Sequence, residues 1–174
     1  MNENSNLIVV FYGELTTKGK NIRDFINLLG KNIRAALKNF KNLTYDIRRD
    51  HIYIHLNGED YNEIKKALEK VPGIGSFALA VRVDKTLDAL KEKALERYNE
   101  VNPSTFKVDT KRADKTFPRT SDQISREVGA YILTHTKNAH VDVHHPELMI
   151  HLSIRRKDAY VYAKKDKGRG GYPL

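Results

Sequence analysis

The residues of this chain best suited to bind an anion are the cations between positions 105 and 123. The segment reads Thr105-Phe-Lys-Val-Asp-Thr-Lys-Arg-Ala-Asp-Lys-Thr-Phe-Pro-Arg-Thr-Ser-Asp-Gln123. Its first residues alternate between apolar and polar, which predicts a strand with Phe106 and Val108 on one face. Thr120 and Gln123 have the spacing of a capping box, which predicts a helix start. A basic loop therefore leads into a helix N-terminus, whose unpaired N–H groups and partial positive charge suit phosphate.

Two features of this loop have alternative interpretations. The cations could contact nucleic-acid phosphates, or they could form an ordinary solvated basic segment. Phe117 could stack on an unpaired base, or it could anchor the loop in the core, and we favour the anchor. The sequence by itself leaves both pairs of alternatives open.

Other reactive groups do not form a recognisable site. His140, His144, His145 and His151 suggest a metal, but the chain has no cysteine and no carboxylate at a ligand spacing. Three Asp residues of the basic segment, at positions 109, 114 and 122, alternate with cations and are interpreted as their salt partners. No nucleophile elbow or Walker-type loop is present. We therefore predict no catalytic residue, no metal and no cofactor in this chain.

The composition favours a protein with an anionic partner. The 174 residues include 40% hydrophobic and 30% charged residues, and the net charge is +9, with the larger share of the positive excess in the second half. No apolar run approaches the length of a membrane span, and the polar N-terminal residues predict no signal peptide. We therefore expect a cytoplasmic protein that does not bind a membrane.

The first half of the chain predicts a ferredoxin-like unit. Its periodicity gives the order βαββαβ, with strands at 7–12, 43–48, 51–56 and 77–83 and helices at 21–41 and 60–71. An RNA-recognition motif is not favoured, because the strand at 51–55 lacks the aromatic signature. An acylphosphatase-like enzyme is not favoured either, because residues 13–21 do not form its phosphate loop.

The predicted helix 21–41 has an unusually basic outer face. Asp24 is the only acidic residue between positions 18 and 41, whereas a solvated helix usually mixes both signs to gain i, i+4 pairs. The outer face carries Lys20, Arg23, Asn27, Lys31, Arg34, Lys38 and Lys41. This face is predicted to contact phosphates, and a merely solvated face remains the alternative.

The second half predicts a smaller α/β unit with a sheet of mixed or uncertain strand order. Its expected elements are helices at 86–101 and 121–135 and strands at 105–111, 148–154 and 160–163. The predicted domains are therefore residues 1–84 and 85–174.

Three motifs resemble those of a known family. The pattern from Phe106 through Lys111, Arg112 and Lys115 to Phe117 resembles the core signature of the THUMP domain, an RNA-binding module of tRNA-modifying enzymes. Residues 13–21 resemble the opening motif of bacterial tRNA 4-thiouridine synthetase, a tRNA sulfurtransferase of the ThiI family. Residues 168–173, Gly-Arg-Gly-Gly-Tyr-Pro, resemble the motif that closes the THUMP domain there. The resemblance covers essentially the whole chain.

This resemblance implies an α+β protein: an N-terminal ferredoxin-like domain followed by a THUMP domain. Full-length members continue into an ATP-pyrophosphatase domain that uses ATP to thiolate uridine 8 of tRNA. The phosphate loop and cysteines of that chemistry do not occur in residues 1–174, so the chain alone is not expected to catalyse thiolation. The partners implied are the acceptor arm and 3′ CCA end of tRNA, the C-terminal ATP-pyrophosphatase domain, a cysteine desulfurase as sulfur donor, and a second copy of the chain.

The resemblance also implies residue roles. The RNA contacts of the THUMP domain fall on Lys111, Arg112, Lys115, Arg119 and, with its two alternatives, Phe117. Lys18, Lys20 and Arg23 support the RNA from the first domain, although Ile22 stands where the family usually has the arginine. An extension of the basic patch is expected at Arg155, Arg156, Lys164, Lys165 and Arg169. Two alternatives remain: the THUMP portion of another tRNA-modifying enzyme, such as a methyltransferase, and a non-catalytic basic adaptor protein.

Overall fold

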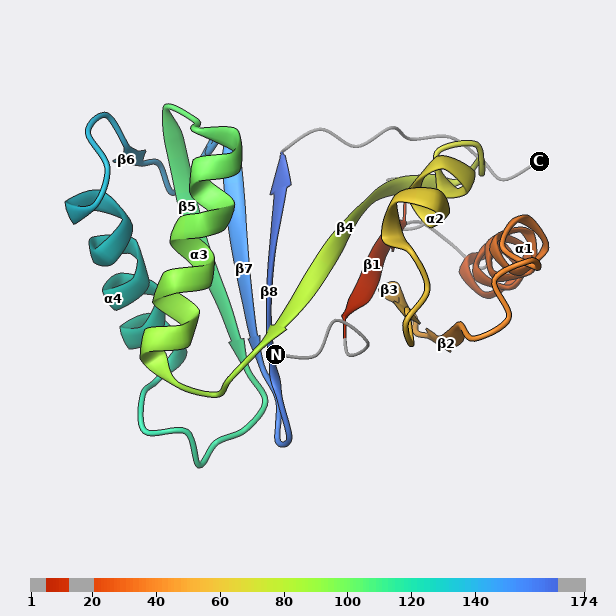
Figure 1. Ribbon diagram of the computed structural model, residues 1–174, viewed down its shortest axis with the longest axis horizontal. Coiled ribbons are helices and arrows are strands. Elements are labelled where there is room, and N and C mark those ends of the chain that lie inside the picture. The colour runs from red at the N-terminus through yellow and green to blue at the C-terminus, as the bar shows by residue number, and fades with distance from the viewer. Residues whose placement is uncertain (1–5, 13–20, 166–174) are drawn as a thin grey trace. The chain divides into compact units, whose positions relative to one another are not determined.

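The computed structural model describes residues 6–12 and 21–165 (Figure 1). These residues form two compact units, and the division falls between Leu79 and Ala80, inside strand β4 (Ile74–Val83). Each unit contains both helices and strands, so the predicted α+β class is confirmed. The domain boundary at residue 84 stays a prediction.

The first unit has the predicted ferredoxin-like topology. Along the chain the order is βαββαβ, and the strands lie in the order β2-β3-β1-β4, with β3 antiparallel to both of its neighbours. The elements before β4 are β1 (Leu7–Tyr12), α1 (Ile22–Ala36), β2 (Thr44–Ile47), β3 (His51–His55) and α2 (Tyr61–Leu68).

The core of the first unit lies between the sheet and its two helices. Alternate residues of β1 and β3, such as Ile8 and Ile52, are fully buried against Leu29 of α1 and Ile64 of α2. A Cβ on Gly30 would lie 2.9 Å from the Cδ1 of Ile47, so glycine lets α1 approach the β2–β3 hairpin closely.

Helix α1 is shorter than predicted. It ends at Ala36, and Leu37 caps it through its N–H, which donates to the carbonyl of Ile33. The apolar period continues to Phe40 because this side chain still packs on the core from the turn that follows the helix. Periodicity alone does not distinguish a last helical turn from a turn that contacts the same core.

The second unit has a mixed sheet covered by two helices. Its strands lie in the order β4-β8-β7-β5-β6, where β5 is parallel to β6 and β7, and β8 is antiparallel to β7 and β4. Strand β6 was not predicted, because it has only two residues and both are exposed. The elements are α3 (Leu87–Val101), β5 (Thr105–Arg112), α4 (Ser121–Thr134), β6 (His140–Val141), β7 (Leu148–Ile154) and β8 (Ala159–Lys165).

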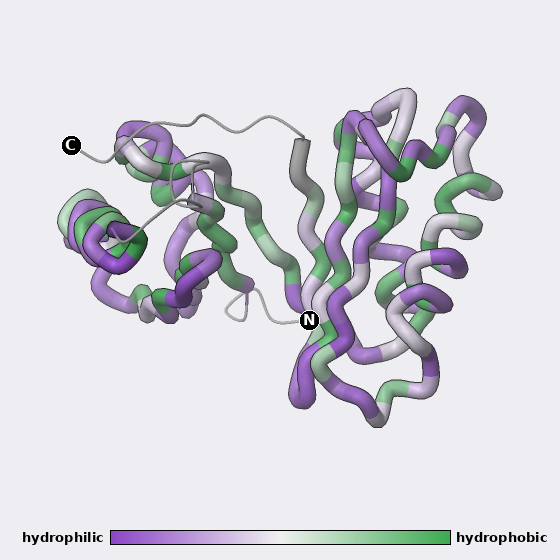
Figure 2. Tube along the Cα trace, turned by 180° about the vertical axis from the view of Figure 1, so that it is seen from behind, coloured by the Kyte–Doolittle hydropathy of each residue, from purple (hydrophilic) through white to green (hydrophobic). Residues whose placement is uncertain are grey.

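Both helices of the second unit pack on one face of its sheet (Figure 1). Phe106 lies opposite Leu148 in the parallel β5–β7 pair, and both side chains are buried beneath α3 and α4. Hydrophobic and hydrophilic residues alternate along these strands (Figure 2), which leaves Lys107 and Lys111 on the opposite face, as predicted.

The register of β5 and β7 brings two connections to the same end of the sheet. Arg112, at the end of β5, lies opposite Ile154, at the end of β7, and the N–H groups of Ala113 and Asp114 both donate to the carbonyl of Ile154. The loop from β5 to α4 therefore starts beside the turn from β7 to β8.

Candidate nucleic-acid interface

The basic loop (residues 113–120) is held in place by Asp114, a buried carboxylate with 8% exposure. Its carboxylate accepts hydrogen bonds from the N–H of Thr116 at 3.0 Å and the hydroxyl of Thr116 at 2.6 Å, and it forms an ion pair with Lys85. The hydrogen bond from Lys85, followed by those from Thr116, holds the pKa of the Asp114 carboxyl well below its usual range.

Lys85 also connects the basic loop to the β7–β8 turn. Its Nζ donates to the main-chain carbonyl of Arg156 at 2.8 Å as well as to Asp114. Three segments far apart in the sequence thus meet at one ammonium group. Asp114 was interpreted as a partner of the neighbouring cations, whereas its actual ion-pair partner lies 29 residues away.

Arg112 shapes the basic loop from inside. Its Nη1 donates to the carbonyl of Lys115 at 3.0 Å and reaches that of Phe117 at 3.4 Å. The side chain is partly buried, and its buried Nε has no hydrogen-bond partner among the described residues. The Arg112 guanidinium therefore mainly fixes the backbone that presents Lys115, and its RNA contact stays a prediction.

Phe117 is part of the core of the second unit. Its exposure is 9%, and it clusters with residues of α4, β5 and β7. A base can stack only on an accessible ring face, so the predicted stacking role is not supported and Phe117 acts as the anchor of the basic loop.

Most of the exposed cations of the second unit, among the residues described, come from the basic loop, from the end of β5 and from the β7–β8 turn. Lys111, Lys115 and Arg119 are exposed, as are Arg156 and Lys157. Lys115 and Arg156 line one hollow of about 370 Å³ together with Lys85, Asp114 and Thr116. The structure thus brings Arg156, which was predicted only as an extension, close to Lys115, and it adds Lys85 and Lys157, which the sequence analysis missed.

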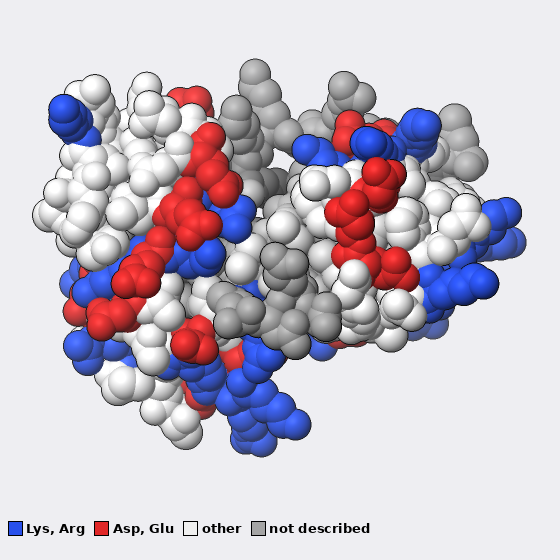
Figure 3. All heavy atoms as spheres, in the orientation of Figure 1, with Lys and Arg blue, Asp and Glu red and all other residues white. Residues whose placement is uncertain are grey.

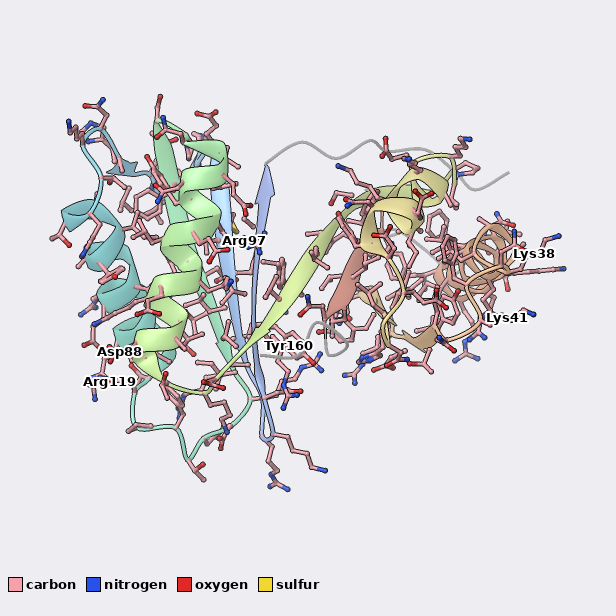
Figure 4. All side chains as sticks on the ribbon, viewed as in Figure 1. Lys38, Lys41, Asp88, Arg97, Arg119 and Tyr160 are labelled. Carbon is pink, nitrogen blue, oxygen red and sulfur yellow. The ribbon has the colours of Figure 1, made fainter. Side chains whose placement is uncertain are left out.

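Arg119 is less available than predicted. Its Nε donates to the Glu127 carboxylate at 2.8 Å, and its side chain is 43% exposed (Figure 4). The predicted capping box at the same helix is present, with Thr120 Oγ1 accepting from the N–H of Gln123 at 3.2 Å and Gln123 Oε1 from the N–H of Thr120 at 2.9 Å. The cap already uses one first-turn N–H group, so fewer remain for an anion than predicted.

The first unit carries a separate cationic surface on α1. Arg23, Lys31, Arg34 and Lys38 are exposed, and Lys38 and Lys41 extend outward from the end of α1 and the turn after it (Figure 4). Arg34 also lies 4.7 Å from the centroid of the Tyr45 ring, which restrains its guanidinium. Lys18, Lys20 and Arg169 lie outside the described residues, and the side chains of Lys164 and Lys165 are not described either.

An acidic ridge runs along α3, away from the sheet (Figure 3). Asp88, Glu92, Glu96 and Glu100 recur every four residues and are all exposed. Lys93 pairs with Glu96 at 3.0 Å and Arg97 with Glu100 at 3.1 Å, which neutralises only part of this charge. A polyanion is therefore repelled from α3, although the whole chain is basic.

The described residues show no arrangement for metal chemistry or for crossing a membrane. No three His, Asp or Glu side chains in them could hold a metal ion together. The carboxylate of Asp142 instead accepts the backbone N–H groups of His144 and His145, both at 3.0 Å, as part of a turn. No helix in the described part of the chain is long and apolar enough to span a bilayer.

Comparison with known proteins identifies two domains in this order. The family model of the ThiI ferredoxin-like domain matches residues 7–78, and that of the THUMP domain matches residues 84–164. A probable tRNA sulfurtransferase of Bacillus pumilus is 44% identical over 96% of this chain and 42% of its own length. That of Bacillus subtilis is 40% identical over 98% of this chain and 43% of its own length. The chain thus spans less than half the length of these relatives.

Comparison with solved structures agrees with the sequence comparisons. The crystal structure of a 4-thiouridine synthetase–RNA complex with bound ATP has a TM-score of 0.69 and 26% identity, covering 98% of this chain and 44% of that one. PH1313 from Pyrococcus horikoshii has a TM-score of 0.67 and 33% identity over 97% of this chain and 57% of its own. The chain therefore belongs to the ThiI family of tRNA sulfurtransferases, of which it contains the ferredoxin-like domain and the THUMP domain.

Proposed function

We propose that this chain is the tRNA-holding portion of a tRNA 4-thiouridine synthetase. It binds the acceptor arm and the 3′ CCA end, so that a separate ATP-pyrophosphatase domain can reach uridine 8. The observation that carries this proposal is the meeting of Lys115 and Arg156 around the partly buried Lys85–Asp114 pair. A similar solved structure is itself a 4-thiouridine synthetase–RNA complex.

The chemistry of the basic loop suits a single-stranded RNA end better than a duplex. An A-form duplex shows side chains little sequence information in its deep major groove, whereas an unpaired end exposes bases and phosphates together. Because Phe117 is buried, the planar guanidinium groups of Arg119 and Arg156 are the surfaces on which a base stacks. Lys111 and Lys115 contact the phosphates.

The test compares three ligands in a filter-binding assay: tRNA, the same tRNA without CCA, and duplex DNA of equal charge. We expect tRNA to bind more tightly than DNA, and removal of the CCA to weaken binding by about 1–3 kcal/mol beyond the effect of lost charge. Equal binding of the two RNAs would reduce the loop to a phosphate clamp. Equal binding of tRNA and DNA would support a basic adaptor instead.

The remaining partners apply to a full-length protein. The resemblance implies ATP and a cysteine desulfurase for the complete enzyme, and a second copy of the chain as a partner. These assignments and the cytoplasmic location stay predictions.

A further inference from the structure

Strand β5 has an edge that its short neighbour leaves uncovered. Strand β6 pairs with β5 only at Thr105 and Phe106, and its last bond is that from the N–H of Asp142 to the carbonyl of Phe106, at 3.0 Å. Asp142 then turns the chain away by accepting two backbone N–H groups. The backbone N–H and C=O groups of successive residues point to alternate sides of a strand. Those of Val108 and Thr110 therefore point to the same side as those of Phe106, where β6 has ended.

A groove of about 540 Å³ follows this edge (the β5-edge groove). One of its walls consists of the consecutive residues 106–110 of β5, and the other comes mainly from α4. Successive side chains of a strand point to opposite faces of the sheet. Five consecutive residues can therefore line one groove only where the groove runs along an exposed edge of the strand. This length corresponds to roughly 16 Å of extended chain.

One end of the β5-edge groove is apolar. Leu133, Val141 and Val143 line it with exposures of 41%, 48% and 58%. The other exposed large hydrophobic residues of the described chain are Leu28 and Ile47, both in the first unit. A Cβ on Gly129 would meet no atom within 4 Å, so the groove is open on its helical side. Exposed apolar residues gathered in one place indicate an interaction site.

The other end of the groove is polar and electrically balanced. Ser121, Asp122, Ser125 and Arg126 line it, and over the whole lining the two cations, Lys107 and Arg126, are equal in number to the two carboxylates, Asp109 and Asp122. Phe106 is the only aromatic residue in the lining, and it is fully buried. The groove therefore has neither the positive field nor the stacking surface that single-stranded RNA requires.

We propose that the β5-edge groove binds an extended segment of a partner protein, which adds to the sheet as a strand beside β5. The backbone of this segment hydrogen-bonds to Val108 and Thr110, its alternate apolar side chains cover Leu133, Val141 and Val143, and an acidic residue faces Arg126. No ion pair joins Arg126 to a carboxylate within the described part of the chain, so this acidic residue supplies its charge partner. The neutral remainder of the groove matches an otherwise uncharged segment.

The test is a titration of the isotope-labelled chain, followed by NMR of its backbone amides. The probe is a blocked peptide in which valine and threonine alternate, with a glutamate at each end. We expect saturable shifts at the amides of Val108, Thr110, Leu133 and Val141. The same peptide with every backbone nitrogen methylated should not bind, because it cannot donate to the strand edge. Equal binding of the methylated peptide would overturn strand addition.

A variant that fills the groove provides the second measurement. Gly129→Leu places a side chain in the open space, and leucine is a better helix former than glycine. We expect peptide affinity to fall by at least about tenfold and tRNA affinity to stay unchanged. Asn99→Leu, an exposed position on α3, is the matched control and should change neither.

Three results would contradict the proposal. The peptide could bind Gly129→Leu as tightly as the original chain. A short oligouridylate could shift the same amides, which would assign the groove to RNA. The amides could shift with protein concentration in the absence of peptide, which would assign the groove to a second copy of the chain.

Discussion

Lys115 is the residue best placed to contact the RNA end. It is exposed, and Arg112 fixes its main chain from below. We expect Lys115→Ala to weaken tRNA binding, to lower the salt slope by about 1, and to remove most of the preference for an intact CCA. Filter binding of tRNA with and without CCA measures this effect.

Lys137→Ala is the matched control for this change. Lys137 is also exposed, but it follows the far end of α4, which is about 21 Å long. This control should bind both RNAs like the original chain. A CCA preference that survives in Lys115→Ala would remove Lys115 from the site.

Asp114 makes the stability of the second unit depend on pH. Its pKa is lowered in the folded state, so its stabilising contribution is complete above its unfolded pKa of about 3.9 and is lost as pH falls below it. We expect the original chain to lose thermal stability between about pH 4 and pH 2, and Asp114→Asn to lose less over the same window. Thermal unfolding followed by circular dichroism measures both. Identical pH profiles would show that the Lys85–Asp114 pair does not contribute.

At the scale of elements, the capping box sets the start of α4 and thereby the end of the basic loop. Thr120→Ala removes the side-chain acceptor for the N–H of Gln123 and should destabilise the chain by about 1 kcal/mol. Urea unfolding measures this loss. Gln123→Ala keeps that acceptor and should cost less, whereas Asn138→Ala, which is exposed beyond the helix, should cost almost nothing. Equal stability of Thr120→Ala and Asn138→Ala would argue against the cap.

Helix α1 is expected to contribute charge without reading the RNA end. Lys38 is exposed in the turn that follows α1 and continues the row of cations on that helix, and such cations contact phosphates without reading bases. Lys38→Ala should therefore weaken intact and CCA-less tRNA by the same factor, as binding curves for the two RNAs would show. A larger effect on intact tRNA would mean that α1 takes part in recognising the CCA.

At the scale of the whole molecule, the net charge of +9 is unevenly distributed. The acidic ridge of α3 stands in contrast to the cations of the basic loop, the β7–β8 turn and α1 (Figure 3). We expect tRNA affinity to fall steeply between low and moderate salt, with each neutralised phosphate adding about 0.7–0.9 to the log–log slope. A slope near zero, measured by filter binding over a salt series, would exclude phosphate contacts as the source of affinity.

Sequence patterns of short range were sufficient to predict most of the elements, and they selected the basic loop as the candidate site. The periodicity of 105–112 placed Lys107 and Lys111 opposite the core, and the spacing of Thr120 and Gln123 placed the start of α4. Both depend on residues within a few positions of one another. Such signals are weak at element ends, which is why α1 was predicted too long and the two-residue β6 was missed.

Only the tertiary structure decided how the candidate site is built. The burial of Phe117, the pairing of Lys85 with Asp114, and the closeness of Arg156 to Lys115 all depend on the register of β5 with β7. That register joins segments dozens of residues apart, and no local pattern in a single sequence encodes it. The cations of the site and the helix cap at its edge could therefore be identified from the sequence. The side chains that hold them together, Phe117 and the Lys85–Asp114 pair, could be identified only from the folded chain.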